Sequence, residues 1–572
     1  MVVAARIGFV TLVVAAILSW DFGFAWLWPL LAGAACLALI ASALLDDGST
    51  TSGRKLRRPA LGGLKALKRG VTDNHGHADW LSVGGMRAQF PGPAPAYGGV
   101  VVGEAYRVDQ QNVAGIRFDP RNKRTWGKGG RAPLLIDPCT DGPTHSMIFA
   151  GPGSFKTTSA VSTLLHWTGS SVVLDPSCEL GPILEDALVK QGKRVHHVGI
   201  NSARDAARCG INVLAWIDPQ HAEAEMHVRT AVSWIYDEDA AALGGKNDDP
   251  FFMPMGKELV TCLLAHMLWD ERVDPSEKNL QTLRVGIEVP EAQMPGVLKG
   301  IQRTSHSPMA RKIASTLMDV RAPETFSGIY ANAVKGTSWL SVTAYGAVVS
   351  NAGLDMRELL DGDTTVFLQV PLQTLLATPA LGRVLVGALL NVVYFADGNI
   401  NGRVLFLLDE AARLGRMKVL EVARDVGRKY GITLQLLYQS MGQLVDQWGR
   451  EGKRAWFDAV SWVGFAAIQD WETAREVSSS FGNHGVMAWS EGDNSGRQMS
   501  AKMGMGSRSR GTTTSEHEIK RALMTPDELM HDARTDEMFV LARGQKPIRC
   551  GRAIYFRRPE LSAQVGLNRF AA

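Results

Sequence analysis

The chain contains the stretch His145-Ser-Met-Ile-Phe-Ala-Gly-Pro-Gly-Ser-Phe-Lys-Thr-Thr158, in which a short apolar segment runs into a glycine-rich turn. This order of residue types predicts a strand, a tight turn and a helix that begins near Lys156. Backbone N–H groups at such a helix start point toward phosphate oxygens, a lysine neutralises the β- and γ-phosphates, and a hydroxyl holds Mg²⁺. The stretch therefore predicts a phosphate-binding loop for a nucleotide and Mg²⁺.

The predicted loop departs in two places from the pattern G-x-x-x-x-G-K-[ST]. Ala150 stands where the first glycine belongs, and Phe155 where the second belongs. An ordinary strand, turn and helix without a ligand is the alternative that such a stretch leaves open. As a phosphate loop it contributes Lys156 as a catalytic residue, Thr157 as a Mg²⁺ ligand, and these nucleotide-binding residues: Gly151, Pro152, Gly153, Ser154, Phe155, Lys156, Thr157 and Thr158.

A second segment, far along the chain, carries carboxylates at the end of an apolar run. Val404-Leu-Phe-Leu-Leu408 is typical of a parallel strand buried on both faces, and Asp409-Glu410 follows it at once. One carboxylate at such a strand end holds Mg²⁺, and the next polarises the attacking water. Acidic pairs also follow strands without any function. Together with the phosphate loop, however, this pair predicts Asp409 as a metal ligand and Glu410 as a catalytic residue.

Two further apolar runs end in polar residues, as expected at the carboxyl edge of an α/β sheet. Ser171-Val-Val-Leu174 leads to Asp175, and Thr433-Leu-Gln-Leu-Leu-Tyr438 leads to Gln439. We predict that Gln439 is catalytic, orienting water or sensing the γ-phosphate; a hydrogen bond at the strand end is the equal alternative. Strand-like runs at 365–370, 460–468 and 538–542 extend the sheet. The predicted fold is α/β, with a RecA-like P-loop nucleotide-binding domain.

The composition fits a folded protein of several parts. The 572 residues have a mass of 62.0 kDa, and at ~150 residues per domain they suggest three or four units. Hydrophobic residues make up 45% and charged residues 21%, which excludes disorder. With 61 Lys and Arg against 57 Asp and Glu the net charge is +4, so nucleic-acid binding depends on local patches. The six cysteines form no C-x-x-C pair, which argues against a zinc ribbon and a disulfide scaffold.

The N-terminal region predicts a two-helix membrane anchor. Trp26 to Leu45 is a 20-residue run without charge, and a helix of that length covers ~30 Å, the thickness of the hydrocarbon core of a bilayer. Ile7 to Trp20 is a shorter apolar run, for which a cleaved signal peptide is the alternative. Basic residues between Arg54 and Arg69 follow the pair, so the positive-inside rule places both termini in the cytoplasm. The predicted units are a transmembrane anchor at 1–48, with helices at about 5–22 and 26–45, and a basic juxtamembrane linker at 49–72.

Further motifs are spread over most of the chain. Besides the two apolar runs and the phosphate loop, they are Asn74-His-Gly-His-Ala-Asp-Trp80, Leu174-Asp-Pro, Leu407-Leu-Asp-Glu-Ala-Ala-Arg-Leu-Gly415, Gln439-Ser-Met-Gly-Gln-Leu444, Glu472-Thr-Ala474 and Arg521-Ala-Leu-Met-Thr-Pro-Asp-Glu528. In this combination the chain resembles the TraG/TraD-type coupling proteins of type IV secretion systems, and within them the conjugal transfer protein TraG branch. It departs from their pattern at Phe155 and at Ser177-Cys178, where such proteins usually carry Lys-Gly.

The resemblance implies a P-loop NTPase of the bacterial inner (cytoplasmic) membrane that couples ATP hydrolysis to DNA translocation. Such a protein forms a hexameric ring, recruits relaxase-bound single-stranded DNA from the relaxosome, and passes it to the type IV secretion channel proteins. It also carries an all-α domain inserted in the nucleotide-binding domain, and Phe252, Met255 and Leu259 repeat at helical spacing. The predicted boundaries are 73–215 for the first part of the nucleotide-binding domain, 216–322 for the all-α domain and 323–572 for the second part.

An arginine from the adjacent subunit commonly completes the active site of ring motors of this type, because it stabilises charge that develops on the γ-phosphate. We predict Arg428, in Gly427-Arg-Lys-Tyr-Gly431, for this catalytic role. A surface ion pair is the alternative for Arg428, and Arg424 and Arg521 are the next candidates.

Between Asn494 and Ser515 a stretch rich in Ser, Gly, Met and Arg predicts a mobile loop. Its basic residues suggest contact with a DNA backbone, and a solvated loop is the alternative.

The leading functional prediction is thus a membrane-anchored coupling ATPase. The alternative is a membrane-tethered substrate-docking receptor, in which Phe155 weakens the phosphate loop and ATPase activity is weak or absent. The presence of Lys156, Thr157, Asp409 and Glu410 favours the enzyme.

Overall fold

The computed structural model describes residues 68–200, 210–236, 251–498 and 507–567. The predicted membrane helices at about 5–22 and 26–45, and most of the linker at 49–72, lie outside these residues. Within the described ranges, the structure contains no helix that is both long enough and apolar enough to cross a membrane.

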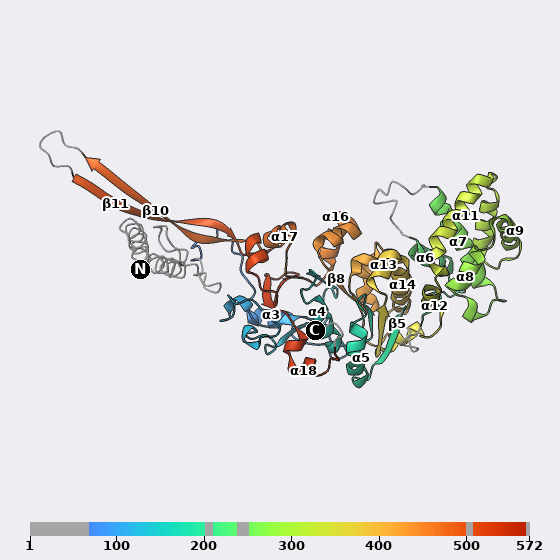
Figure 1. Ribbon diagram of the computed structural model, residues 1–572, viewed down its shortest axis with the longest axis horizontal. Helices are drawn as coiled ribbons and strands as arrows, with labels where there is room; N and C mark the ends of the chain where they lie inside the picture. The colour runs from blue at the N-terminus through green and yellow to red at the C-terminus, as the bar shows by residue number, and fades with distance from the viewer. Residues whose placement is uncertain (1–67, 201–209, 237–250, 499–506, 568–572) are drawn as a thin grey trace, which may run out of the picture. The chain divides into compact units, whose positions relative to one another are not determined.

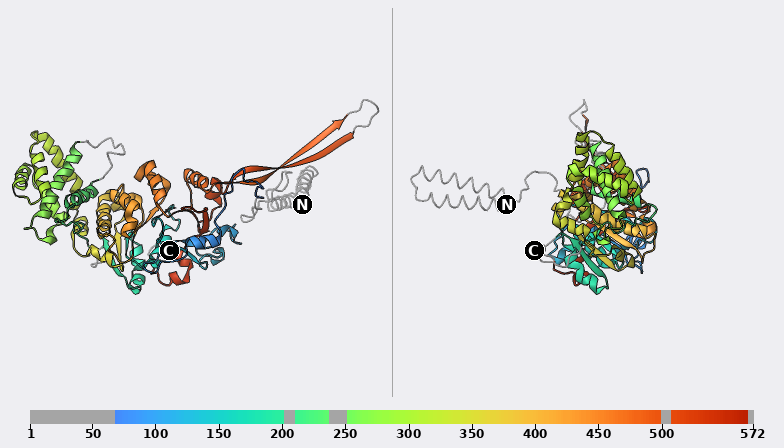
Figure 2. Two further views of the ribbon diagram at one scale, coloured as in Figure 1. Left: turned by 180° about the vertical axis from the view of Figure 1, so that it is seen from behind. Right: turned by 90° about the vertical axis from the view of Figure 1, so that its right-hand side faces the viewer.

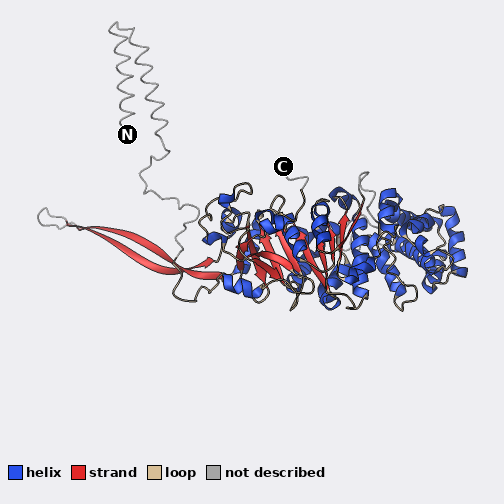
Figure 3. Cartoon of the chain, turned by 90° about the horizontal axis from the view of Figure 1, so that it is seen from below, coloured by secondary structure: helices blue, strands red, loops and turns tan. Residues whose placement is uncertain are grey.

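One mixed sheet of eleven strands forms the centre of the described chain (Figure 3). Its strand order is β2-β1-β13-β12-β9-β3-β8-β7-β4-β6-β5. From β9 to β5 in this order, neighbouring strands are parallel, and the remaining four extend the sheet in antiparallel pairs. The strands are β1 (Val100–Glu104), β2 (Leu134–Asp137), β3 (Ser146–Ala150), β4 (Ser171–Leu174), β5 (Arg194–Gly199), β6 (Thr364–Gln369), β7 (Val404–Leu408), β8 (Ile432–Tyr438), β9 (Trp462–Ala466), β12 (Glu537–Ala542) and β13 (Ile548–Gly551).

Helices cover both faces of the parallel strands, which is why the central strands carry apolar residues on both faces, most clearly β7 with its sequence Val-Leu-Phe-Leu-Leu. On β3, Met147 and Phe149 belong to one hydrophobic core and Ile148 and Ala150 to the other, since alternate residues of a strand point to opposite faces. Apolar side chains of α14 pack in the first core, and those of α4 and α5 in the second. The helices around the sheet are α3 (Val83–Gln89), α4 (Lys156–His166), α5 (Leu180–Lys190), α13 (Leu372–Ala377), α14 (Pro379–Phe395), α15 (Lys418–Val426), α16 (Met441–Ala459), α17 (Trp471–Phe481) and α18 (Pro559–Ser562).

A run of helices interrupts the sheet between β5 and β6. In Figure 1, α7 to α11 lie together beyond the β5 end of the sheet. Their apolar faces share one core with the adjacent face of the sheet. The helices are α6 (Ala224–Ile235), α7 (Phe252–Trp269), α8 (Leu280–Ile287), α9 (Met294–Thr304), α10 (Pro308–Met318), α11 (Pro323–Thr337) and α12 (Thr343–Ser350).

The helices of this run continue past residue 322, the predicted end of the all-α domain, as far as Ser350. Pro323 begins a helix at this point: it is the first residue of α11, where the missing N–H of proline has no intrahelical partner to lose. Arg284 of α8 ties α11 into the helical group by donating to the Val334 carbonyl at 3.0 Å and to the Thr337 hydroxyl at 2.8 Å. The sheet resumes only with β6.

β10 (Asn483–Gln498) and β11 (Ser507–Ala522) form a separate hairpin that extends away from the sheet (Figure 2). The prediction of a loop between Asn494 and Ser515 is wrong for most of that stretch, because strand pairing continues as far as Gln498 and Ser507. The loop was predicted because this stretch is rich in serine and glycine and lacks the alternation of apolar and polar residues that indicates a strand. An antiparallel pair nevertheless satisfies its backbone N–H and C=O groups whatever side chains it carries.

His145, directly before β3, is hydrogen-bonded to the backbone of β8, and it gives the fold a predictable response to acid. Burial lowers the pKa of His145 to about 4, below its ordinary value of 6.5, and its Nδ1 accepts the Leu434 N–H at 3.0 Å. The unfolded chain therefore binds a proton at this side chain more readily than the folded chain does. Its contribution to stability is complete above pH 6.5 and is lost as the pH falls toward 4.

We expect the free energy of unfolding to fall by about 2 kcal/mol between pH 7.5 and pH 5 because of His145 alone. Urea unfolding of the full chain and of His145→Gln at the two pH values measures this contribution as the difference between their pH dependences. Glutamine keeps a hydrogen-bond acceptor but does not titrate. The same loss of stability in both proteins would contradict the assignment.

Candidate nucleotide-binding site

The predicted phosphate loop connects β3 to α4 at the carboxyl edge of the sheet, where ligands of α/β sheets bind. Gly153 has a φ of 67°, a left-handed conformation that glycine adopts without strain. The Ser154 hydroxyl donates to the Gly151 carbonyl, and the Ser154 N–H donates to the same carbonyl at 3.3 Å. The turn around Pro152 is thus closed by its own residues.

Phe155 occupies the position of the second glycine and takes a conformation that favours glycine. Its φ of 60° and ψ of 30° lie in the left-handed region, which costs a residue with a side chain about 1 kcal/mol. Its ring makes edge-to-face contacts with Phe118 and Phe556, with 5.6 and 6.0 Å between ring centroids. The departure from the expected pattern therefore preserves a backbone course that a glycine would also follow.

The helix α4 begins directly after Phe155, so the free N–H groups of its first turn lie at the loop. Lys156 and Thr157 are its first two residues, and Thr157 is half-buried. The Thr158 hydroxyl donates to the Phe155 carbonyl at 2.6 Å. Of the eight predicted residues, Gly151 to Phe155 thus form the connection between β3 and α4, and Lys156 to Thr158 form the start of α4.

Lys156 joins this loop to both predicted carboxylates. Its Nζ lies 2.9 Å from Oδ1 of Asp409 and also donates to Oε1 of Glu410, which stands 254 positions away in the chain. Both carboxylates are buried. Burial alone lowers the pKa of Lys156, but the two negative charges outweigh it and raise the pKa. The lysine is thus held charged at the point where the loop meets the end of β7.

Gln439 ends up beside the same carboxylate, because β8 lies between β3 and β7 in the sheet. Its Nε2 donates to Oε1 of Glu410 at 2.8 Å, and its backbone N–H donates to Oε1 of Gln443 at 2.9 Å. Glu410 itself has a φ of 57°, and in the part of the chain that the structure describes, its buried Oε2 has no hydrogen-bond partner. A strained, buried carboxylate with one unsatisfied oxygen is typical of a functional group.

Asp175, at the end of β4, is engaged elsewhere. Its carboxylate accepts the backbone N–H groups of Leu180 at 2.9 Å and Gly181 at 3.3 Å at the start of α5. It also accepts the Ser177 hydroxyl at 2.9 Å. Ser177 therefore stabilises the turn before α5.

Arg428 lies far from these residues within its own chain. It belongs to the short 3₁₀ turn Gly427–Tyr430, which precedes β8, whereas Gln439 follows β8. A strand of seven residues separates the two ends by about 20 Å. Arg428 is exposed and donates to the Thr140 carbonyl at 3.4 Å. In this chain alone it is not part of the site.

The other two candidate arginines are also engaged away from the loop. Arg424 pairs with Asp425 at 2.6 Å and lies over the ring of Trp456, and Arg521 pairs with Glu528.

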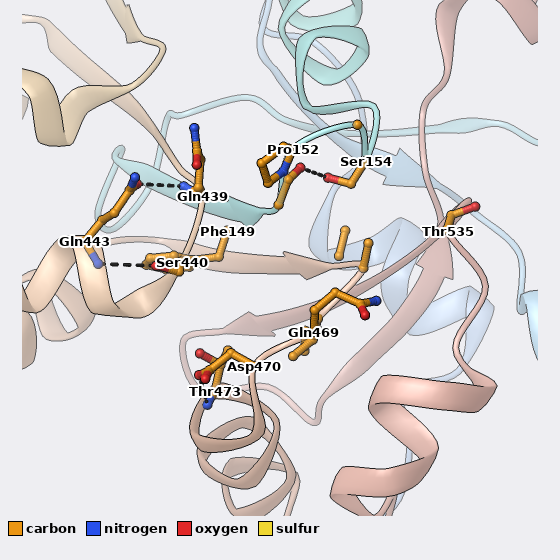
Figure 4. Close-up of a pocket in the computed structure, with 15 residues that line it drawn as sticks. Phe149, Pro152, Ser154, Gln439, Ser440, Gln443, Gln469, Asp470, Thr473 and Thr535 are labelled. Atoms are coloured by element: carbon orange, nitrogen blue, oxygen red, sulfur yellow. Dashed lines mark hydrogen bonds between the residues drawn. The ribbon is translucent and has the colours of Figure 1, made fainter. Parts of the chain in front are cut away.

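A cavity of about 450 Å³ opens beside the phosphate loop (Figure 4). Loop residues Pro152 and Ser154 line one side of it, and Gln439 lines another. The far side is formed by Gln469 and by Asp470, whose carboxylate accepts the Thr473 N–H at 2.8 Å and so caps α17. The loop and the end of β8 are thus accessible from a common space.

Comparison with known proteins assigns the family. The family described as Type IV secretory system Conjugative DNA transfer matches residues 95–572. The chain belongs to this family. It is 39% identical to the type IV secretion system-coupling protein VirD4 of Bartonella henselae over 90% of this chain and 77% of that protein. It is 38% identical to the conjugal transfer protein TraG of Agrobacterium fabrum over 87% of this chain and 72% of that protein.

Solved structures of one coupling protein share the fold. TrwB in complex with ADP and Mg²⁺ aligns with a TM-score of 0.55 at 14% identity, over 86% of this chain and 96% of that chain. TrwB in complex with the GTP analogue GDPNP aligns with a TM-score of 0.51 at 14% identity, over 73% of this chain and 88% of that chain. At this identity the likeness concerns the α/β fold.

Sequence reasoning missed the residues that support the phosphate loop from outside. Phe118 and Phe556 contact Phe155, and Arg552 donates to the Ser154 carbonyl from 398 positions away. No local motif marks these three positions. The sequence around β13 alternates between apolar and polar residues. This pattern predicts a strand, but it does not predict that Arg552 contacts Ser154.

Removing Lys156 from the nucleotide-free protein should be costly, because two buried carboxylates would lose their counter-charge. We expect Lys156→Ala to lower the free energy of unfolding by about 3 kcal/mol. In a chain that already carries Glu410→Gln, the same change should cost at least about 1 kcal/mol less, since one charge is gone. Urea unfolding of the four proteins measures this coupling.

Glu451→Gln is the matched control, because Glu451 is an exposed acid that pairs with Arg454 on the surface. Its effect should add to that of Lys156→Ala without coupling. Purely additive effects of Lys156→Ala and Glu410→Gln would show that the ion pair does not form in solution.

Proposed function

We propose that this chain is the coupling ATPase of a type IV secretion or conjugation system. It hydrolyses ATP to pass relaxase-bound single-stranded DNA from the relaxosome to the secretion channel. The observation that carries the proposal is the meeting of Lys156, Glu410 and Gln439 at the carboxyl ends of three neighbouring parallel strands. Family membership supports the role in secretion or conjugation, and this group of side chains supports ATP hydrolysis.

Each of these side chains has a role that follows from its position. Lys156, at the start of α4, binds β- and γ-phosphate oxygens once it leaves its carboxylate partners. Glu410 then keeps its bond to Gln439, which fixes the orientation of the carboxylate. Its second oxygen is free to accept a hydrogen bond from the attacking water and to polarise it.

The residues present also fit Mg²⁺. Thr157 and Asp409 are the groups that would hold the ion, and a hydroxyl and a carboxylate are the hard oxygen ligands that it prefers. The unsatisfied Oε2 of Glu410 is consistent with a site built for a water or ligand that the protein alone does not supply. Bound there, Mg²⁺ would offset the charge of the β- and γ-phosphates. The ADP and Mg²⁺ in a TrwB structure of the same fold support this assignment.

The remaining parts of the proposal concern assembly and location. We place the protein in the bacterial inner membrane through the helices at about 5–22 and 26–45, with both termini in the cytoplasm. A hexameric ring would bring Arg428 of one subunit to the phosphates of the next, since Arg428 lies at the opposite edge of the sheet from its own loop. In such a ring, a few basic side chains per copy add up to a DNA-binding channel despite the net charge of +4.

Phe155 bears on the alternative of a docking receptor without ATPase activity. That alternative requires the phenylalanine to disturb the phosphate loop. Phe155 instead adopts a left-handed backbone conformation and packs between two aromatic rings. This observation favours an active site.

DNA-stimulated ATP hydrolysis by the full chain in detergent tests the enzymatic claim. We expect Lys156→Ala to abolish both ATP binding and turnover, because it removes the phosphate ligand. Glu410→Gln should bind ATP but lower kcat at least about a hundredfold, since the amide does not polarise water. The surface control Glu451→Gln should match the unmodified chain. Equal turnover by all four proteins would refute the proposed enzyme.

Mixing experiments test the role of Arg428 in a neighbouring subunit. Arg428→Ala and Lys156→Ala chains should each be inactive alone, and a mixture should recover part of the activity at interfaces that combine an intact loop with an intact arginine. Arg454→Ala, which changes an exposed arginine, should stay active alone. If mixed rings form, as measured by mass, and no activity returns, Arg428 does not act between subunits.

A further inference from the structure

Arg552 is a buried arginine whose backbone is fixed on both sides. It follows β13 directly and is 0% exposed. The backbone N–H of Arg552 donates to the Asp536 carbonyl at 2.9 Å, and the backbone carbonyl of Arg552 accepts a hydrogen bond from Nη2 of Arg557 at 2.7 Å. The origin of its side chain is therefore determined by the antiparallel part of the sheet.

The guanidinium of Arg552 reaches the phosphate loop. Nη1 donates to the backbone carbonyl of Ser154, whereas Nε and Nη2 have no hydrogen-bond partner in the described part of the chain. Burial and the nearby Arg557 lower the pKa of Arg552 to about 10. A buried cation without a carboxylate partner is unfavourable, so its presence at this position calls for a function.

The hydrogen bond to Ser154 controls the direction of the next N–H group. A trans peptide unit is planar, and its C=O and N–H bonds point in opposite directions. When Arg552 holds the Ser154 carbonyl on the outside of the loop, the Phe155 N–H must point to the inside, where phosphate oxygens bind. The same peptide leads into the left-handed conformation of Phe155.

A second contact comes from the same segment. Phe556, four residues after Arg552, packs against the ring of Phe155 at 6.0 Å between centroids. Phe118 completes this aromatic group, and Arg557 lies over its ring at 5.3 Å. The backbone of the loop and its unusual side chain are therefore both supported by residues 552–556.

The charge around Arg552 also suits an anion. Four arginines are buried in this region with two buried carboxylates, while a third buried carboxylate, that of Glu537, pairs with Arg549. Half-exposed Glu560 pairs with the outermost of the four arginines. Ion pairs connect them at distances from 2.7 to 3.7 Å, but none reaches Arg552. The excess of positive charge therefore lies next to the phosphate loop. The arginines are Arg534, Arg552, Arg557 and Arg558, and the carboxylates belong to Glu104 and Asp536.

We propose that Arg552 is a positioning residue for the phosphates of ATP. By holding the Ser154 carbonyl outward, it aims the Phe155 N–H at the phosphate site. It thereby supports a loop in which Phe155 stands in place of the usual glycine. The proposal rests on the ATP binding proposed above and adds a residue outside every motif of the phosphate loop. It predicts an effect on the binding of ATP and not on the hydrolytic step, because Arg552 does not approach Glu410 or Gln439 in the interactions that the structure describes.

The test is a titration of the full chain in detergent with fluorescent ATP and Mg²⁺, together with steady-state hydrolysis. We expect Arg552→Gln to raise the Kd and KM for ATP at least tenfold and to leave kcat within about twofold, because the shorter amide does not reach the Ser154 carbonyl. Arg552→Lys keeps a charged donor and should restore the Kd to within about threefold. Phe556→Ala, at a half-buried position, should raise the Kd about threefold without loss of folding.

Arg549→Gln is the matched control, since Arg549 is a largely buried arginine on β13 that pairs with Glu537 and does not contact the loop. It should leave the Kd unchanged. Unchanged Kd values for both Arg552→Gln and Phe556→Ala would overturn the inference, and so would an equal loss of affinity in Arg549→Gln. An unmodified chain that binds no ATP would overturn the proposed function as well, so the two failures are distinguishable.

Discussion

The contact of Lys156 with the carboxylates of Asp409 and Glu410 is the interaction around which the described chain is organised. It joins two segments 254 positions apart, and it does so among buried groups. Leaving buried charges unpaired is costly, so this pairing favours a fixed separation between the ends of β3 and β7. Strand order and helix packing, which set this separation, therefore also determine the geometry of the site.

The strand order explains how the contact arises. β8 lies between β3 and β7, and Gln439 at its end bridges to Glu410. The helical insertion between β5 and β6 leaves this part of the sheet undisturbed, because it is attached at the far edge. The antiparallel strands on the other side carry Arg552 to the outside of the phosphate loop. The loop is thus held from the Glu410 side by ion pairs and from the β13 side by one hydrogen bond and an aromatic contact.

Much of this arrangement was predictable because it is local. The apolar runs that end in Asp409 and Gln439 predict buried parallel strands, and a lysine after a glycine-rich turn predicts the start of a helix. The end of the helical insertion was not predictable in the same way. A proline such as Pro323 can follow the end of one helix or begin the next, and here it begins α11. The hairpin was missed because its pairing depends on backbone groups. Arg552 was missed because nothing near it in the chain refers to Ser154, and only the assembled sheet brings them together.

Lys156, which we propose binds phosphate, is bonded to the two carboxylates that we propose act on water and metal. In the proposed function, ATP replaces these carboxylates as the partner of Lys156. A structure of the full chain with a non-hydrolysable ATP analogue and Mg²⁺ tests it most directly. We expect Lys156 on the β- and γ-phosphates, with Glu410 still bonded to Gln439. A bound analogue that leaves the Lys156–Glu410 pair in place would contradict it.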